Sequence, residues 1–250
     1  MELSEKIRKK MVSAMADFHM IEAGDRVMVA VSGGKDSTAM LLLLRDIQAK
    51  APFDFSIHPV ILDQKQPGFS VEQFDQFLAS EGFKLDIITE DTYSIVLDKV
   101  SGGKSFCGLC SRLRRGILYN YAEAKGYSKI ALGHHREDLN ETLLLNIFFN
   151  GRVASMPPKL QSDDGRNTVI RPMAYVPEAW LIELQEGLNF PVIPCNLCGS
   201  QDNLQRSQMK AMLSSLYDRH ANIGSSMLNA LANVRPSQLM DRDLWDFEKL

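Results

Sequence analysis

Short apolar runs alternate with longer stretches of helical periodicity along the first 150 residues of the chain. The apolar runs predict buried strands at residues 26–31, 56–62, 84–89 and 129–132. The stretches between them predict helices at residues 1–20, 35–50, 71–82 and 137–150, and a basic helix that ends near Lys125. Strands that alternate with helices are typical of an α/β protein with a doubly wound parallel sheet, which we therefore predict.

This alternation loosens after residue 150. Turn-forming sequences predict loops at Met156-Pro157-Pro158, Asp163-Asp164-Gly165 and Arg171-Pro172. Helical patterns return at residues 177–187, 201–219 and 223–232. We therefore expect two parts: an α/β domain of residues 1–150, and a helical C-terminal extension of residues 151–250 that packs back on it.

The composition is that of an ordinary globular protein, with 45% hydrophobic and 24% charged residues. The net charge of −3 gives no global basic field, so any RNA binding must come from local patches. The longest apolar run, near Ala39 to Leu44, is too short to span a bilayer, and residues 1–20 lack the apolar segment of a signal peptide. We therefore expect a cytoplasmic protein without a membrane partner.

A glycine-rich loop joins the first predicted strand to the helix that follows, with the sequence Ser32-Gly33-Gly34-Lys35-Asp36-Ser37. Backbone N–H groups at a helix start form an anion site, and glycines let phosphate oxygens approach closely. The lysine adds charge, the two serines add hydroxyl donors, and Asp36 can hold a magnesium ion that bridges phosphates. The Walker pattern is absent, because Lys35 is followed by aspartate. The loop therefore predicts nucleotide binding by a different motif.

Four cysteines form two C-x-x-C pairs, Cys107 with Cys110 and Cys195 with Cys198. In a reducing compartment such pairs are more often metal-binding or catalytic than structural disulfides. The two pairs are distant in sequence, so a shared site requires tertiary folding. Four thiolates suit a structural zinc ion, whereas three can hold three irons of a 4Fe-4S cluster. A redox disulfide and plain buried cysteines are further readings, and the spacing alone leaves all of them open.

Several motifs carry a resemblance to known enzymes. The loop Ser32–Ser37 looks like the pyrophosphatase-type (PP) loop of NAD synthetases, GMP synthetases and tRNA-modifying thiolases. Four longer segments resemble the tRNA 2-thiocytidine synthetase family, a group of tRNA cytidine(32) 2-sulfurtransferases, over nearly the whole chain. These segments begin at Leu62, Cys107, Leu132 and Pro194, and read LDQKQPGF, CGLCSRLRRGILY, LGHHRED and PCNLCGSQ.

The resemblance implies an adenine nucleotide alpha-hydrolase-like fold and a specific reaction. ATP is cut between its α and β phosphates and the C2 oxygen of cytidine 32 in tRNA is adenylated. Sulfur from a cysteine desulfurase then reaches the base through a 4Fe-4S cluster. We place the cluster ligands at Cys107, Cys110 and Cys198, with Cys195 as the spare. The family also implies binding of the tRNA anticodon loop and a homodimer.

The motif that begins at Leu132 follows a predicted strand, where ligands bind in open α/β sheets. We expect Gly133 to contact the nucleotide. We expect Asp138 to act in catalysis with Lys35 and Asp36. Either Asp138 or Glu137 can bind magnesium or orient the base. The family usually has aspartate at position 137, so Glu137 is a departure that keeps the charge and lengthens the reach.

Three arginines follow directly on the first cysteine pair. Arg112 and Arg115 share a helix face, and with Lys104 and the neighbouring Arg114 we expect them to bind phosphates of the anticodon loop. A solvated basic face gives the same pattern. His134 and His135 likewise suit either a ligand site or packing at a helix start.

Two other functions stay open from the residues themselves. ATP-dependent amidation of a small molecule uses the same loop, but leaves the cysteines and arginines unexplained. A zinc-stapled nucleotide-binding module on RNA explains the cysteines without catalysis. A sister activity on uridine is disfavoured only by the motif match.

Overall fold

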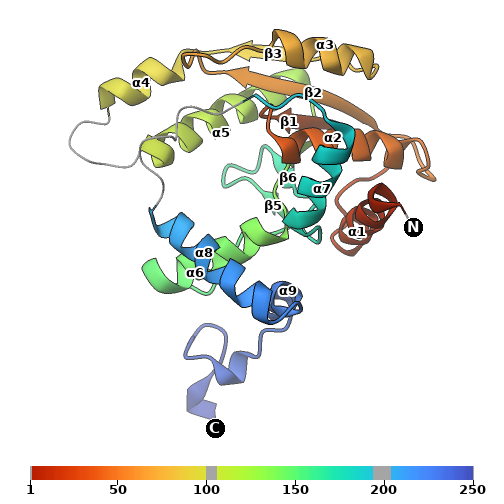
Figure 1. Ribbon diagram of the computed structural model, residues 1–250. Helices are drawn as coiled ribbons and strands as arrows, with labels where there is room; N and C mark the ends of the chain where they lie inside the picture. Colours follow the sequence, from red (N-terminus) through yellow and green to blue (C-terminus); the bar gives the residue numbers. More distant parts are fainter. Residues whose placement is uncertain (1, 100–105, 194–203, 250) are drawn as a thin grey trace.

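The computed structural model describes residues 2–99, 106–193 and 204–249 (Figure 1). Over these residues the central sheet has six strands in the order β3-β2-β1-β4-β6-β5. Neighbouring strands are parallel except for β5, which pairs antiparallel with β6 at one edge. The strands are β1 (Arg26–Val31), β2 (Ser56–Asp63), β3 (Asp86–Thr89), β4 (Lys129–Leu132), β5 (Lys159–Gln161) and β6 (Thr168–Ile170).

Helices cover both faces of this sheet, and further helices form a separate layer. The helices are α1 (Leu3–Asp17), α2 (Lys35–Gln48), α3 (Glu72–Ser80), α4 (Thr92–Lys99), α5 (Phe106–Lys125), α6 (Arg136–Phe149), α7 (Glu178–Leu188), α8 (Leu204–Arg219) and α9 (Ile223–Ala232). Two short 3-10 turns follow, at Pro236–Gln238 and Phe247–Lys249. In the described part of the chain, no helix is long and apolar enough to cross a membrane.

The core has two parts because successive residues of a strand face opposite sides of the sheet. Val27 and Val29 of β1 pack into the larger cluster, with buried residues of α1, α2 and α7. Met28, between them, packs into the smaller cluster with Leu118 and Ala122 of α5. Helices α6, α8 and α9 pack against one another and form the lower layer in Figure 1.

The prediction of a doubly wound α/β fold with a helical extension is confirmed. The four predicted strands are all present, and the helices end within a few residues of their predicted bounds. The β5–β6 hairpin was expected to be loop, and α4 was not predicted. Because β6 pairs in parallel with β4, the sheet continues past residue 150, the expected boundary between the two parts.

The chain direction reverses between β1 and β4, which is the topological switch point of the sheet. From β1 the chain moves outward through β2 and β3, and then returns to the other side of β1 as β4. Since these strands are parallel, the residues after β1, β2, β4 and β6 meet at one edge, which we call the carboxyl edge. Ligands of open α/β sheets bind at such an edge.

Candidate active site

The glycine-rich loop lies at the carboxyl edge, after β1, and leads directly into α2. Hydrogen bonds of its two serines stabilise the loop. The Ser32 N–H donates to Ser37 Oγ over 3.0 Å, and Ser37 Oγ donates to the Gly34 carbonyl over 3.2 Å. Gly34 caps the helix in an extended conformation. The first N–H groups of any helix lack partners within it, so this loop presents an anion site at a positive helix end.

Two glycines allow close packing around this loop. Gly33 has a φ of +76°, and a Cβ atom there would lie 2.7 Å from the Ile193 side chain. A Cβ atom on Gly133, at the end of β4, would lie 2.9 Å from the backbone of Ser37. Gly133 was predicted to contact the nucleotide, and its packing shows that it also lets β4 approach the start of α2.

The backbone that leads to the second cysteine pair is fixed beside the loop. The Ile193 N–H donates to the Gly33 carbonyl over 2.9 Å. Ile193 is two residues before Cys195 in the sequence. Cys195 and Cys198 themselves lie outside the described residues.

Lys35 lies between two carboxylates at the start of α2. Its Nζ is 2.9 Å from Asp36 Oδ1 and 3.3 Å from Glu178 Oε1. Burial alone would lower the pKa of Lys35, but the two carboxylates outweigh it and raise that pKa. Glu178 also pairs with Lys210 of α8 over 3.0 Å. The sequence did not single out Glu178, which lies 143 residues from Lys35 and meets it only in the folded chain.

His135 is enclosed by carboxylates, and its side chain is 5% exposed. It lies 3.5 Å from Glu137 Oε2, 3.4 Å from Asp138 Oδ2 and 3.8 Å from Glu178 Oε1. Burial acts to lower the pKa of His135, and these carboxylates together raise it. This histidine therefore links the carboxylates at the starts of α6 and α7.

Glu137 joins α6 to α7. Its Oε2 accepts the Glu178 N–H over 2.7 Å, and its Oε1 accepts from Arg136 Nε over 2.9 Å. Burial would raise the pKa of Glu137, but His135, Arg136 and the Glu178 N–H lower it to about 2. These contacts to Arg136 and Glu178 explain the glutamate at position 137, where the family usually has aspartate.

Asp138 is held at the start of α6. Its Oδ2 accepts the His135 N–H over 3.0 Å, and its Oδ1 pairs with Arg206 of α8 over 3.0 Å. Within the described residues, no group of three or more His, Cys, Asp or Glu side chains is arranged to hold a metal ion. Magnesium binding by Asp36 and Asp138 stays a prediction.

Cys107 lies on the first turn of α5, and Cys110 lies about one turn later on the same helix. The Cys110 thiol donates to Gln64 Oε1 over 3.3 Å, and Thr92 Oγ1 donates to the same oxygen over 3.1 Å. Gln64 follows β2 and is buried, so Cys110 is at the carboxyl edge beside β1. The side chain of Cys107 lies outside the described part.

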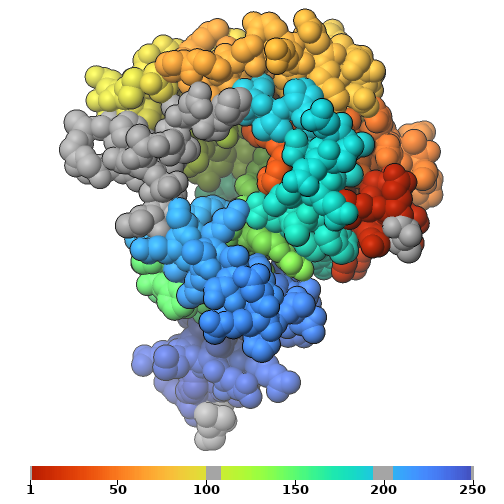
Figure 2. Space-filling model, in the orientation of Figure 1, coloured from red at the N-terminus to blue at the C-terminus, as the bar shows by residue number. Residues whose placement is uncertain are grey.

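The predicted RNA-binding arginines lie on α5. Arg112 and Arg115 are exposed, and Arg114 is half-buried. Over the described ranges, no carboxylate forms an ion pair with any of the three. Figure 2 shows the surface hollowed between α7 and α8, the two helices that supply Glu178 and Arg206.

Arg171, another residue that sequence reasoning missed, follows β6 at this edge. It is 7% exposed, its Nε donates to His134 Nδ1 over 3.3 Å, and its Nη1 donates to the Pro157 carbonyl over 2.5 Å. Burial lowers the pKa of His134 to about 4, and Arg171 acts in the same direction. His134 is therefore neutral, and its Nδ1 is free to accept from Arg171. The Arg171-Pro172 sequence had suggested only a loop.

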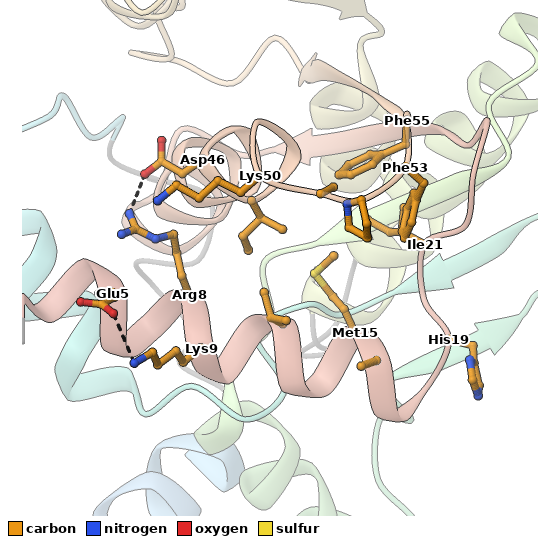
Figure 3. Close-up of a pocket in the computed structure, with 15 residues that line it drawn as sticks. Glu5, Arg8, Lys9, Met15, His19, Ile21, Asp46, Lys50, Phe53 and Phe55 are labelled. Atoms are coloured by element: carbon orange, nitrogen blue, oxygen red, sulfur yellow. Dashed lines mark hydrogen bonds and ion pairs between the residues drawn. The ribbon is translucent and has the colours of Figure 1, made fainter.

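A separate cavity of about 880 Å³ lies between α1, α2 and residues 50–55 (Figure 3). Aromatic side chains, Phe53 and Phe55, form part of its wall. Four of its charged residues pair with one another, as the dashed lines in Figure 3 show for Arg8 with Asp46 and for Lys9 with Glu5. This pairing makes it a poor match for a charged substrate.

A doubly wound sheet with this loop at its switch point defines a PP-loop protein, and a model of the PP-loop domain matches residues 3–210. Within that class, the chain belongs to the tRNA-cytidine(32) 2-sulfurtransferase family and is a transferase. It is 54% identical to the member from Bdellovibrio bacteriovorus, over 99% of this chain and 95% of that protein. It is 55% identical to the Tolumonas auensis member, over 100% and 82% of the two chains. These matches confirm the resemblance.

A solved structure shares the fold. The U34-tRNA thiolase NcsA from Methanococcus maripaludis, solved with its [4Fe-4S] cluster, superposes with a TM-score of 0.74. The match covers 94% of this chain and 80% of that one, at 19% identity.

Proposed function

We propose that this protein converts cytidine 32 of tRNA to 2-thiocytidine in an ATP-dependent reaction. The observation that carries the proposal is the meeting of two features at one edge of the sheet. The phosphate loop follows β1, while Cys110 and the backbone before Cys195 reach the same edge. Membership of a family of tRNA sulfurtransferases supports this substrate.

The chemistry begins with activation, because the C2 oxygen of cytosine is a poor leaving group. That oxygen attacks the α-phosphorus of ATP, the bond to the β-phosphate breaks, and pyrophosphate leaves. A sulfur nucleophile then adds to C2, and the carbon–oxygen bond breaks with release of AMP. The N–H groups of Gly33 and Gly34, the hydroxyls of Ser32 and Ser37, and the Lys35 ammonium stabilise the negative charge that develops on the phosphates.

Two bound groups complete the proposed reaction. A 4Fe-4S cluster on Cys107, Cys110 and Cys198 supplies sulfur from an open iron when it is bound. Magnesium supplies charge neutralisation, and Asp36 and Asp138 are its ligands in the proposal. The half-buried Cys110 and the anchored Ile193 are the features of this chain that support the cluster.

The partners follow from the same reaction. Arg112, Arg114 and Arg115 bind anticodon-loop phosphates, because they are cations without carboxylate partners among the described residues. A cysteine desulfurase supplies the sulfur. The proposed enzyme is a homodimer. Its location is the cytoplasm, where its tRNA substrate is found.

The products of ATP test the activation step. Wild-type protein with unmodified tRNA and sulfide should form AMP and pyrophosphate, and omission of tRNA should abolish both. Lys35→Ala should reduce AMP formation by about 10²- to 10³-fold, because one preorganised cation is removed from the developing charge. Lys50→Ala, an exposed lysine just beyond the far end of α2, is the matched control and should act as wild type. Release of ADP and phosphate instead would refute adenylation.

The cluster needs its own measurement. Protein purified without oxygen should contain about four irons and four sulfides per chain, the content of one 4Fe-4S cluster. Cys198→Ala should lose them, whereas Cys195→Ala should keep them. A colourless protein with one zinc per chain would contradict the cluster and would indicate a structural zinc site instead.

A further inference from the structure

Arg171 is a buried cation that has no carboxylate partner in the described part of the chain. Among residues 2–99, 106–193 and 204–249, the hydrogen-bond partners of its guanidinium are neutral groups, the His134 ring and the Pro157 carbonyl. Asp138 acts on Arg171 from a distance but forms no ion pair with it. No hydrogen bond reaches Arg171 Nη2 from the described residues, and Nη2 is not among the buried atoms that lack a partner, so it retains contact with solvent.

Other cations at the same edge are paired. Lys35 contacts Asp36 and Glu178, and Arg206 contacts Asp138 and Glu141. Buried charges in proteins are normally paired, because an isolated charge loses its hydration without compensation. An arginine that is 7% exposed and bonded to neutral partners is therefore suited to an anion from outside the described chain, at its Nη2.

The position of Arg171 separates it from the ATP phosphates. It follows β6, which lies beyond β4 from the loop strand β1, and two strand spacings amount to about 10 Å. Gly133 packs on the start of α2, and His134, the next residue, contacts Arg171. Tyr119 of α5 is close enough for Arg171 to act on its pKa, so the helix of Arg112, Arg114 and Arg115 borders the same place.

We propose that Arg171, oriented by His134, binds a phosphate group of the tRNA backbone at the carboxyl edge. A guanidinium presents its nitrogens in a planar fork that matches phosphate oxygens. His134 fixes that fork by accepting from Nε, which leaves Nη2 directed to the ligand. Because this RNA contact rests on the proposed function, the test measures tRNA binding directly, without ATP or sulfur.

The test compares Arg171→Gln with Arg166→Gln. Arg166 lies on the same hairpin and already pairs with Glu123 and Asp164, so it is the matched control. We expect Arg171→Gln to weaken binding of unmodified tRNA about tenfold, since one charged phosphate contact is lost. The slope of log Kd against log salt should become shallower by about 0.7, the value for one phosphate of a single strand. Arg166→Gln should leave both unchanged.

Further measurements separate the alternatives. Arg171→Lys keeps the charge, so its salt slope should stay at the wild-type value. The melting temperature of Arg171→Gln should not fall below that of Arg166→Gln, because an unpaired buried charge is removed. A tRNA affinity and slope equal to wild type would overturn the inference, as would a loss confined to ATP affinity. Failure of the wild-type protein to bind tRNA would instead refute the proposed function.

Discussion

The two edges of the central sheet use charged residues in opposite ways. At the amino edge, formed by residues before β1 and β4, Asp25 and Arg26 both have local partners. Asp25 accepts from Ser128 Oγ over 2.7 Å and pairs with Lys129 over 3.6 Å. Arg26 donates to the Lys125 carbonyl over 2.8 Å and lies 5.1 Å from the Tyr127 ring centre.

The carboxyl edge leaves polar groups without such matches. Gln66 Oε1 is buried with no hydrogen bond among the described residues, and Arg171 has no carboxylate partner there. Burying unmatched polar groups destabilises a fold. The amino edge therefore contributes stability, while the carboxyl edge retains binding capacity at the expense of stability.

Glu137 gives the largest expected effect, because it is a buried carboxylate at the carboxyl edge whose two oxygens both have hydrogen-bond donors. Its pKa falls from 4.5 to about 2 on folding. A depressed pKa contributes stability above pH 4.5, and that contribution disappears as the pH falls toward 2. Glu137→Gln should lower the free energy of unfolding by about 3 kcal/mol at pH 7, and this deficit should shrink to near zero at about pH 2.

Urea denaturation at a series of pH values measures this effect. Glu81→Gln is the control, because its carboxylate also accepts from an arginine but is 34% exposed. Its effect should be below about 1 kcal/mol at every pH. A Glu137→Gln deficit that does not change with pH would contradict the matched-carboxylate interpretation.

Gly133→Ala should affect function at the carboxyl edge. The added Cβ would lie 2.9 Å from the Ser37 backbone, so β4 and the phosphate loop must move apart. Displacement of a catalytic group by about 1 Å reduces rates by about 100-fold, which is about 2.7 kcal/mol. Single-turnover thiolation and ATP titration calorimetry measure the loss. Gly116→Ala on α5 is the control, because its added Cβ meets nothing within 4 Å, and it should change neither the thiolation rate nor the ATP affinity. If both variants behaved alike, the close approach of Gly133 to Ser37 would not be needed for function.

Asp25→Asn gives the smallest of these effects and should change stability alone. It weakens the bonds to Ser128 and Lys129, and a hydrogen bond to a charged group contributes about 1.5–3 kcal/mol. We expect a loss near the lower end of that range, since the amide keeps one acceptor oxygen. The thiolation rate of the folded variant should equal that of wild type. A rate loss without a stability loss would erase the contrast between the edges.

Local patterns in the sequence were sufficient for four of the six strands of the sheet, β1 to β4, and for the phosphate loop. β1 and β4 are apolar runs bounded by polar or glycine residues, and the loop signal is contiguous. The β5–β6 hairpin escaped because its strands are three residues long between turn-forming sequences. Their pairing depends on β4, which is distant in sequence.

The site residues that were missed depend on distant partners. Lys35 and Glu178 are 143 residues apart, and Asp138 and Arg206 are 68 apart. Neither spacing is periodic, so neither leaves a local pattern. Arg171 in turn lies within a turn-forming sequence, and its burial is decided by His134 and Pro157. Only the folded chain brings these groups to the carboxyl edge.

The central claim is the chemical change at one nucleotide of tRNA. The most direct measurement is mass spectrometry of nuclease fragments of tRNA after anaerobic reaction with the protein, ATP and sulfide. We expect sulfur in place of oxygen on cytidine 32, formed only when ATP is present, with one AMP released per sulfur. Sulfur on a uridine, or AMP formation with an unmodified cytidine 32, would contradict the account.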